Sequence, residues 1–174
     1  MANNKSGFDR AKTDGEPALK RELERAPYDF PRGILQHVNL ASEQFDKMLH
    51  IDLVAHYMII DKNSTDSGSV DFCFIDLKDP DNITTGNVTI DVDEIRFFKN
   101  YRKKMSDYIL AFRLNDGINH RYNMFRLFEV SDVLSYIDEK NPEVRNGGEN
   151  SGYYLINMSD LAESRPFFEV GSVK

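Results

Sequence analysis

The sequence contains little that would support a zinc site, a disulfide or a membrane anchor. It has one cysteine, Cys73, and four histidines, and none of these stand at zinc-ligand spacing. As the only cysteine, Cys73 is predicted to be a small buried hydrophobe in a reducing, cytoplasmic setting. The chain also lacks a run of about 18 apolar residues and an apolar N-terminal segment, so we expect neither a membrane span nor a secretory signal.

Three familiar signatures and an excess of positive charge are missing as well. No Walker A loop, GxGxxG fingerprint or GxSxG nucleophile elbow is present, which argues against the sites that these motifs build. The chain has 22 Lys and Arg against 29 Asp and Glu, giving a formal net charge of −7. That balance excludes a surface that coats nucleic acid along its whole length. It still allows a localised basic patch or a divalent metal held by carboxylates.

The length suits one folded domain preceded by an arm. A chain of 174 residues buries roughly 70% of its unfolded surface, enough for a core without disulfides. Residues 1–15 are polar, and we expect them to be mobile. Glu16–Ala26 has Pro17 near its start and mixed charges, which predict a short exposed helix with little apolar face. We therefore divide the chain into a flexible arm at 1–33, able to dock on a partner or a second copy, and a single α/β domain at 34–174.

A β-hairpin is predicted near the start of this domain. Two apolar, β-branched and aromatic runs at 51–60 and 70–78 flank a polar loop. Symmetric closure about that loop makes the numbers of facing residues sum to about 131. In this register Asp52, at the start of the first strand, comes level with the end of the second strand, at Asp76 and Lys78.

The hydrophobic pattern of the second strand breaks at one end of one face. Side chains alternate along a strand, so Asp76 and Lys78 continue the face of Phe72 and Phe74, while Leu77 continues the opposite face. The break therefore consists of a carboxylate and a lysine that face a second carboxylate across the hairpin.

The remaining elements complete an α/β pattern. Apolar periodicity predicts helices at 34–49, 91–105 and 131–137 and a helical turn at 159–163. Strands are predicted at 88–90, 108–114, 121–130 and 153–157, with a polar loop at 138–152 and frayed last residues. This alternation of helices and strands implies a mixed sheet.

The order of the elements and the charged end of the hairpin resemble the PD-(D/E)XK, or restriction-endonuclease-like, nuclease superfamily. Its pattern places an acid at the start of one strand and D/E-x-K at the end of the adjacent strand, with a helix before and a helix and strand after. Here Asp52 matches the first acid and Asp76-Leu77-Lys78 the second motif, within residues 34–137. The resemblance implies an α/β fold with a mixed β-sheet flanked by helices, in helix-hairpin-helix-strand order. Small domains of bacterial defence and phage proteins are the most similar members.

The resemblance also implies a metal site for hydrolysis of phosphodiester bonds. Asp52, Asp76 and the backbone carbonyl of Leu77 would hold Mg²⁺ or Mn²⁺, since hard cations take oxygen ligands. Lys78 would orient the attacking water and offset charge that develops on the phosphate. Glu43, on the helix predicted before the hairpin, would add a ligand directly or through water.

Other interpretations of these residues stay open at this point. His50-Ile51 replaces the Pro that names the motif, and Asp76 stands where Glu is commoner, which also fits an inactive copy. Asp76 and Lys78 would equally fit a structural role as solvent-exposed residues at the end of a strand, each paired with neighbouring charges. A second acid-x-Lys match, Asp138-Glu139-Lys140, falls in a predicted polar loop, and we reject it on that context.

A basic cluster ends the helix predicted at 91–105. It consists of Lys99, Arg102, Lys103 and Lys104. Positive charge at a helix C-terminus offsets the macrodipole, so a solvated helix end explains the cluster. On a restriction-endonuclease-like fold the same side chains would contact phosphates beside the metal.

Two functions from different classes follow. The first is a metal-dependent endonuclease of phage or bacterial defence origin that acts on nucleic acid, in particular DNA, and works as a homodimer because one small site cuts one strand. The second is a non-catalytic acidic binding protein, an inhibitor or adaptor that captures a protein partner, which the net charge of −7 favours.

Overall fold

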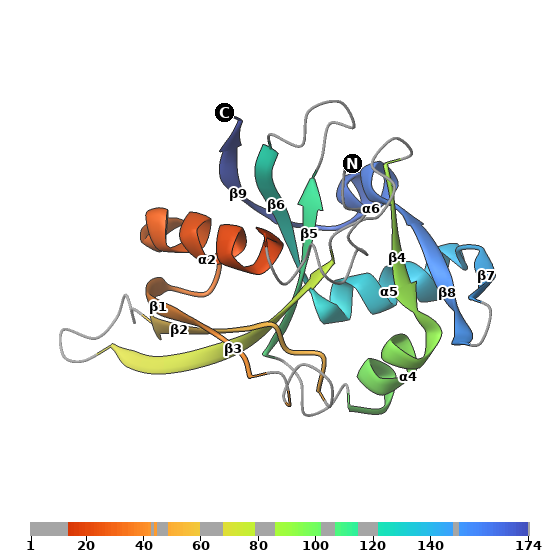
Figure 1. Ribbon diagram of the computed structural model, residues 1–174, viewed down its shortest axis with the longest axis horizontal. Helices are drawn as coiled ribbons and strands as arrows, with labels where there is room; N and C mark the ends of the chain where they lie inside the picture. Colours follow the sequence, from red (N-terminus) through yellow and green to blue (C-terminus); the bar gives the residue numbers. More distant parts are fainter. Residues whose placement is uncertain are drawn as a thin grey trace, which may run out of the picture.

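The structure has two sheets and four α-helices in its described part (Figure 1). This computed structural model describes residues 14–42, 44, 49–59, 68–78, 86–101, 107–114, 122–147 and 150–173. The large sheet contains, in spatial order, β1 (Ile34–Leu40), β2 (Leu53–Ile59), β3 (Ser69–Lys78), β5 (Tyr108–Leu114), β6 (Tyr122–Glu129) and β9 (Phe168–Val173). The small sheet contains β4 (Asn87–Asp91), β8 (Asn150–Asn157) and β7 (Val144–Gly147). The helices are α2 (Glu16–Arg25), a 3-10 turn at Pro27–Asp29, α4 (Val92–Tyr101), α5 (Val130–Lys140) and α6 (Met158–Ser164).

The large sheet is mixed, as predicted. β3 and β5 run parallel, with Asp76 beside Leu110 and Lys78 beside Phe112, whereas the other described pairs of this sheet are antiparallel. The chain between β3 and β5 carries β4 and α4, the kind of crossover that parallel neighbours require. The α/β prediction with a mixed sheet flanked by helices is therefore confirmed.

Two apolar cores lie on opposite faces of the large sheet. Figure 1 shows α2 on one side of it and α4, α5 and α6 on the other. The first core contains Leu19 and Leu23 of α2 with Ile75 and Leu77 of β3. The second contains residues of α4, α5 and α6, and Phe74 packs against it. The predicted alternation of side chains along β3 is thus confirmed, and Asp76 and Lys78 lie on the face of the second core.

The helix predicted at Glu16–Ala26 exists, but the expectation that it is exposed with little apolar face is wrong. Ala18, Leu19 and Leu23 are at most 1% exposed, because they form one side of α2 that packs on the sheet. This part of the predicted arm belongs to the first core. Residues 1–13 lie outside the described part, so the mobility of the chain's start stays a prediction.

The helix predicted at 34–49 is wrong, because residues 34–40 form β1. A β-bulge between Leu35 and His37 shifts the register of β1 against β2. The buried residues Leu35 and Val38 are therefore three positions apart, which imitates helical spacing in the sequence. Glu43 lies outside the described residues, and its assignment as a metal ligand stays a prediction.

The C-terminal third contains more strand than predicted. β7 occupies part of the predicted loop at 138–152, and its single apolar side chain, Val144, is exposed, so the sequence of this strand shows no apolar alternation. The last residues form β9, which pairs with β6, instead of fraying. None of the described helices is long and apolar enough to cross a membrane.

Candidate functional site

The hairpin of β2 and β3 closes with a different register from the predicted one. Leu53 faces Ile75 where the symmetric loop would place Lys78, a shift of three residues. The backbone N–H of Asp52 donates to the Ile75 carbonyl at 3.0 Å, and Asp52 Oδ2 accepts the N–H of Leu77 at 2.7 Å. The Asp52 carboxylate is therefore bound to the middle residue of the Asp76-Leu77-Lys78 motif.

Lys78 is held between two buried carboxyl groups. Its Nζ lies 2.9 Å from Asp76 Oδ2 and 2.8 Å from Glu94 Oε2. Asp76 and Glu94 are 4% and 3% exposed. Few acids are buried this deeply unless they are paired, so the ammonium group is essential to the arrangement.

Glu94 was not among the predicted site residues. It lies in the first turn of α4, where an acid also interacts favourably with the helix dipole. Its position four residues before the buried Phe98 places it on the apolar face of α4. An acid on the buried stripe of a helix was the signal that could have identified it.

Glu16 of α2 is a second acid that the sequence reasoning missed. It is 9% exposed, and its charge contributes to the raised pKa of Asp52. An acid from a preceding helix was expected at Glu43, whereas the structure places Glu16 near Asp52. A carboxylate at the start of a helix also interacts favourably with the helix dipole.

His50, which precedes β2, also lies near the site. Its charge acts on the carboxylate of Asp76, and its ring contacts Phe97 and Phe98 of α4. His50 has φ of 51°, in the left-handed region that few non-glycine residues adopt. Residues in such conformations cluster at functional sites, and this one lies two positions before Asp52.

Asp52 has an unusual protonation equilibrium. Burial and the negative charge of Asp76 raise its pKa to about 8, and Glu16 adds to the shift. The hydrogen bond from Leu77 and the charge of Lys78 act in the opposite direction. A large part of the Asp52 population therefore carries a proton at pH 7.

Asp76 and Glu94 share the charge of one lysine and do not both ionise. Burial opposes ionisation of Asp76 most strongly, but the charge of Lys78, together with the neighbouring Glu94 and His50, outweighs burial and lowers the pKa of Asp76. Burial and the charge of Asp76 raise the pKa of Glu94 well above its usual value. Lys78 stays charged, since Asp76 and Glu94 outweigh its burial and raise its pKa. Glu94 thus keeps its proton while Asp76 carries the negative charge.

The donor set fits a hard divalent cation that keeps several waters. Within the described ranges, no group of three or more His, Cys, Asp and Glu side chains is arranged to hold a metal ion. Mg²⁺ needs only one or two carboxylates in addition to water. Apart from its ion pair with Lys78, Asp76 Oδ2 has no hydrogen-bond partner among the described residues. When Asp52 is ionised, Asp52 and Asp76 together carry more negative charge than Lys78 balances, and a bound cation would relieve this excess.

The predicted nucleic-acid contacts are only partly described. Lys99 lies at the surface, with its Nζ 2.6 Å from Asp138 Oδ1. Arg102, Lys103 and Lys104 lie outside the described residues, so their role stays a prediction. Residues 138–140 form the end of α5 and not a loop, and Asp138 and Lys140 are both exposed there.

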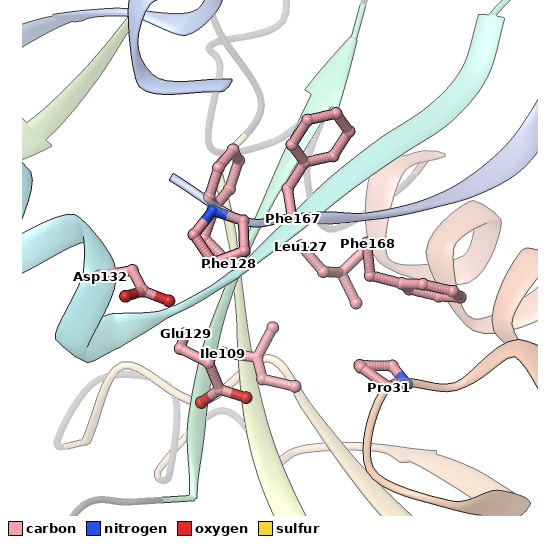
Figure 2. A pocket seen from close by; sticks show the side chains of 9 residues that line it. Pro31, Ile109, Leu127, Phe128, Glu129, Asp132, Phe167 and Phe168 are labelled. Carbon is pink, nitrogen blue, oxygen red and sulfur yellow. The ribbon is translucent and has the colours of Figure 1, made fainter. Parts of the chain in front are cut away.

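A separate pocket of about 230 Å³ shares no residue with this site (Figure 2). Figure 2 shows the carboxyl groups of Glu129 and Asp132 and the ring of Phe167 at its wall. Ile109 and Leu127 line it from the face of the sheet opposite to Asp76. The acids of the hairpin end therefore form a site independent of this pocket.

Comparison with known proteins gives one similar fold. No protein-family model matches the chain, and no curated protein matches it. A solved structure of a nuclease from a fusselovirus is similar, with a TM-score of 0.54 and 13% sequence identity. The match covers 91% of this chain and 88% of that chain. At this level of identity, the likeness shows a shared fold.

Proposed function

We propose that this protein is a divergent PD-(D/E)XK nuclease that hydrolyses phosphodiester bonds of DNA with Mg²⁺ or Mn²⁺. The observation that carries the proposal is the attachment of the Asp52 carboxylate to the backbone N–H of Leu77, between Asp76 and Lys78. The fold shared with a nuclease from a fusselovirus supports it, and a phage or defence origin would suit that likeness. Whether two copies act together stays a prediction.

Asp52, Asp76 and the Leu77 carbonyl would hold the cation. A bound divalent cation would supply Lewis-acid polarisation of the phosphate and a more acidic water. Asp52 would release its proton as the site fills, because its pKa of about 8 depends on burial and on nearby negative charge. Glu16 stands near enough to Asp52 to add negative charge to the same site.

Lys78 would be the group that meets the scissile phosphate. Its ammonium group stays charged and is oriented by Asp76 and Glu94 at 2.9 and 2.8 Å. A fixed positive charge offsets the charge that develops on the phosphate oxygens. Glu94 is a positioning residue in this scheme, because its contact is with Lys78 and not with substrate.

The test is cleavage of plasmid and single-stranded DNA in buffers that contain Mg²⁺, Mn²⁺ or EDTA. Asp52→Asn, Asp76→Asn and Lys78→Gln should each lower the metal-dependent rate by about a hundredfold or more. Asp93→Asn and Lys140→Ala are matched controls, since both residues are exposed ends of surface ion pairs. The controls should stay within about twofold of the wild-type rate.

Asp52→Asn is the decisive variant, because an amide replaces a carboxyl group that is already partly neutral and the fold should be preserved. Absence of cleavage with every metal, or equal rates for Asp52→Asn and Asp93→Asn, would overturn the proposal. The non-catalytic binding protein would then be the better account of the acidic surface.

A further inference from the structure

Five aromatic side chains form a continuous row across the large sheet. We call His37, His56, Phe72, Phe74 and Tyr108 the ring row. His37 and His56 stack with centroids 4.4 Å apart and planes 16° apart. Successive centroid distances are then 6.4 Å from His56 to Phe72, 5.3 Å to Phe74 and 5.1 Å to Tyr108. The row crosses β1, β2, β3 and β5 and so runs across the strands.

One end of the ring row is open to solvent, and the other end reaches the candidate site. Phe72 is 43% exposed and His37 is also exposed, whereas Tyr108 is 2% exposed. Tyr108 lies next to the site, because it pairs with Phe74 in the parallel β3–β5 ladder and stands two residues before Leu110, which pairs with Asp76. Along β3, the exposed Phe72, the half-buried Phe74 and the buried Asp76 share one face.

The two outer strands of the ring row, β1 and β2, are free of carboxylates. β1 and β2 contain no Asp or Glu, although the whole chain has a net charge of −7. Asn39, exposed two residues after His37, adds an amide able to donate to and accept from a base. Asp71 of β3 is on the opposite face from Phe72. A polyanion would therefore meet little repulsion on this stretch of a generally acidic surface.

We propose that the exposed end of the ring row, formed by His37, His56 and Phe72, is a base-stacking platform for single-stranded DNA that leads to the Asp76 and Lys78 site. This inference rests on the proposed nuclease function and names its substrate as DNA with unpaired bases. Flat rings displayed across neighbouring strands bind unstacked bases, because every base offers a π-face. Duplex DNA has no free base faces and gains nothing from such a platform.

A second copy of the chain is the other occupant to consider, since β1 is an edge strand of the sheet. Two stacked imidazoles and an amide suit bases better than they suit the apolar core of a protein interface. The row also ends at the groups proposed to cut phosphodiester bonds, which a self-association surface does not require.

The experiment measures binding of the full-length protein to fluorescein-labelled oligothymidine and to a duplex of equal length, in EDTA and at low salt. Phe72→Leu keeps an apolar side chain and removes the ring, and it should weaken single-strand binding by about tenfold. Phe72→Tyr should restore it. Phe167→Leu is the matched control, because Phe167 is 42% exposed and belongs to the separate pocket. It should bind like the wild type.

Equal affinity of Phe72→Leu and wild type for the single strand, or tighter binding of the duplex by the wild type, would overturn the platform. So would a wild-type dimer that Phe72→Leu dissociates without change in single-strand affinity. Binding in EDTA is independent of cleavage, because EDTA removes the divalent metal that cleavage is proposed to need. Binding that depends on the Phe72 ring, without any cleavage, would thus support the platform and contradict the nuclease. Cleavage with binding that does not depend on the ring would support the nuclease and contradict the platform.

Discussion

Two groups in the described part of the structure each bring one cation to more than one acid, and they differ in charge balance and burial. We call Lys78 with Asp52, Asp76 and Glu94 the hairpin cluster, and Arg32 with Glu129 and Asp107 the arginine clamp. Arg32 Nε donates to Glu129 Oε1 at 3.0 Å, and Asp107 Oδ1 lies 3.5 Å from Arg32 Nη1. The side chains of Glu129 and Asp107 are 38% and 40% exposed, so solvent shares in stabilising both charges.

The comparison teaches how to separate a structural ion pair from a functional one. In the arginine clamp, solvent reaches both carboxylates, and the clamp ties the segment before β1 to β6. In the hairpin cluster, buried acids outnumber the single cation, so protons are retained at Glu94 and partly at Asp52. Groups held out of their ordinary protonation state in this way are more frequent at functional sites than elsewhere.

The largest difference is expected when each cation is removed. Lys78→Met leaves two buried carboxyl groups without their cation and should lower the free energy of unfolding at pH 7 by about 3–5 kcal/mol. Arg32→Met leaves exposed carboxylates and should lower it by about 1–2 kcal/mol. Urea unfolding of both variants measures the difference. The difference between the two variants should shrink at pH 4, where protonation removes the buried negative charge. Equal losses of unfolding free energy at pH 7 would contradict the distinction between the hairpin cluster and the arginine clamp.

A divalent cation should stabilise the hairpin cluster and leave the arginine clamp unaffected. At a Mg²⁺ concentration about a hundred times its dissociation constant, the free energy of unfolding should rise by about 2.7 kcal/mol. The rise should be larger at pH 8.5 than at pH 6, because binding requires ionised Asp52. Thermal unfolding with and without Mg²⁺ measures it. Asp76→Asn should abolish the effect, and its persistence in that variant would place the metal elsewhere.

Asp52→Asn should stabilise the protein in a pH-dependent way. Folding raises the pKa of Asp52 from about 4 to about 8, so the native state binds an extra proton between these values. The stability contribution of Asp52 therefore falls as pH rises through that window. The substitution should leave the free energy of unfolding unchanged at pH 4 and raise it at pH 8 by on the order of 1–2 kcal/mol. Urea unfolding at the two pH values measures the difference. A difference that stays constant with pH would contradict the raised pKa.

The smallest effect is expected for Glu129→Gln. The amide oxygen that replaces the exposed carboxylate can still accept a hydrogen bond from Arg32. The free energy of unfolding should therefore fall by less than about 1 kcal/mol. Unfolding in urea measures the loss, and DNA cleavage should stay at the wild-type rate. A loss of cleavage in this variant would show that the arginine clamp also takes part in function.

The sequence predicted the hairpin and its charged end because strand patterns and side-chain alternation are local. Asp76 and Lys78 share a face whatever the sheet around them does. The register could not be predicted in the same way, since the loop of the hairpin does not close symmetrically. The error of three residues moved Asp52 closer to Asp76 than the sequence suggested.

The missed acids show what local patterns cannot supply. Glu16 and Glu94 come from helices far apart in the chain, and only the packing of α2 and α4 on opposite faces of the sheet brings them toward the end of β3. The bulge in β1 had a similar effect, because it gives the strand the apolar spacing of a helix. The helix predicted from that spacing is the reason that Glu43 was expected at the site. Tertiary context decided each of these cases.

The most direct test of the account is an NMR titration of the Asp52 carboxyl carbon, with and without Mg²⁺. We expect Asp52 to titrate near pH 8 in metal-free protein and at a clearly lower pH when Mg²⁺ is present. An Asp52 that titrates near its ordinary value of about 4 and does not respond to Mg²⁺ would show that the hairpin cluster is a structural ion network like the arginine clamp.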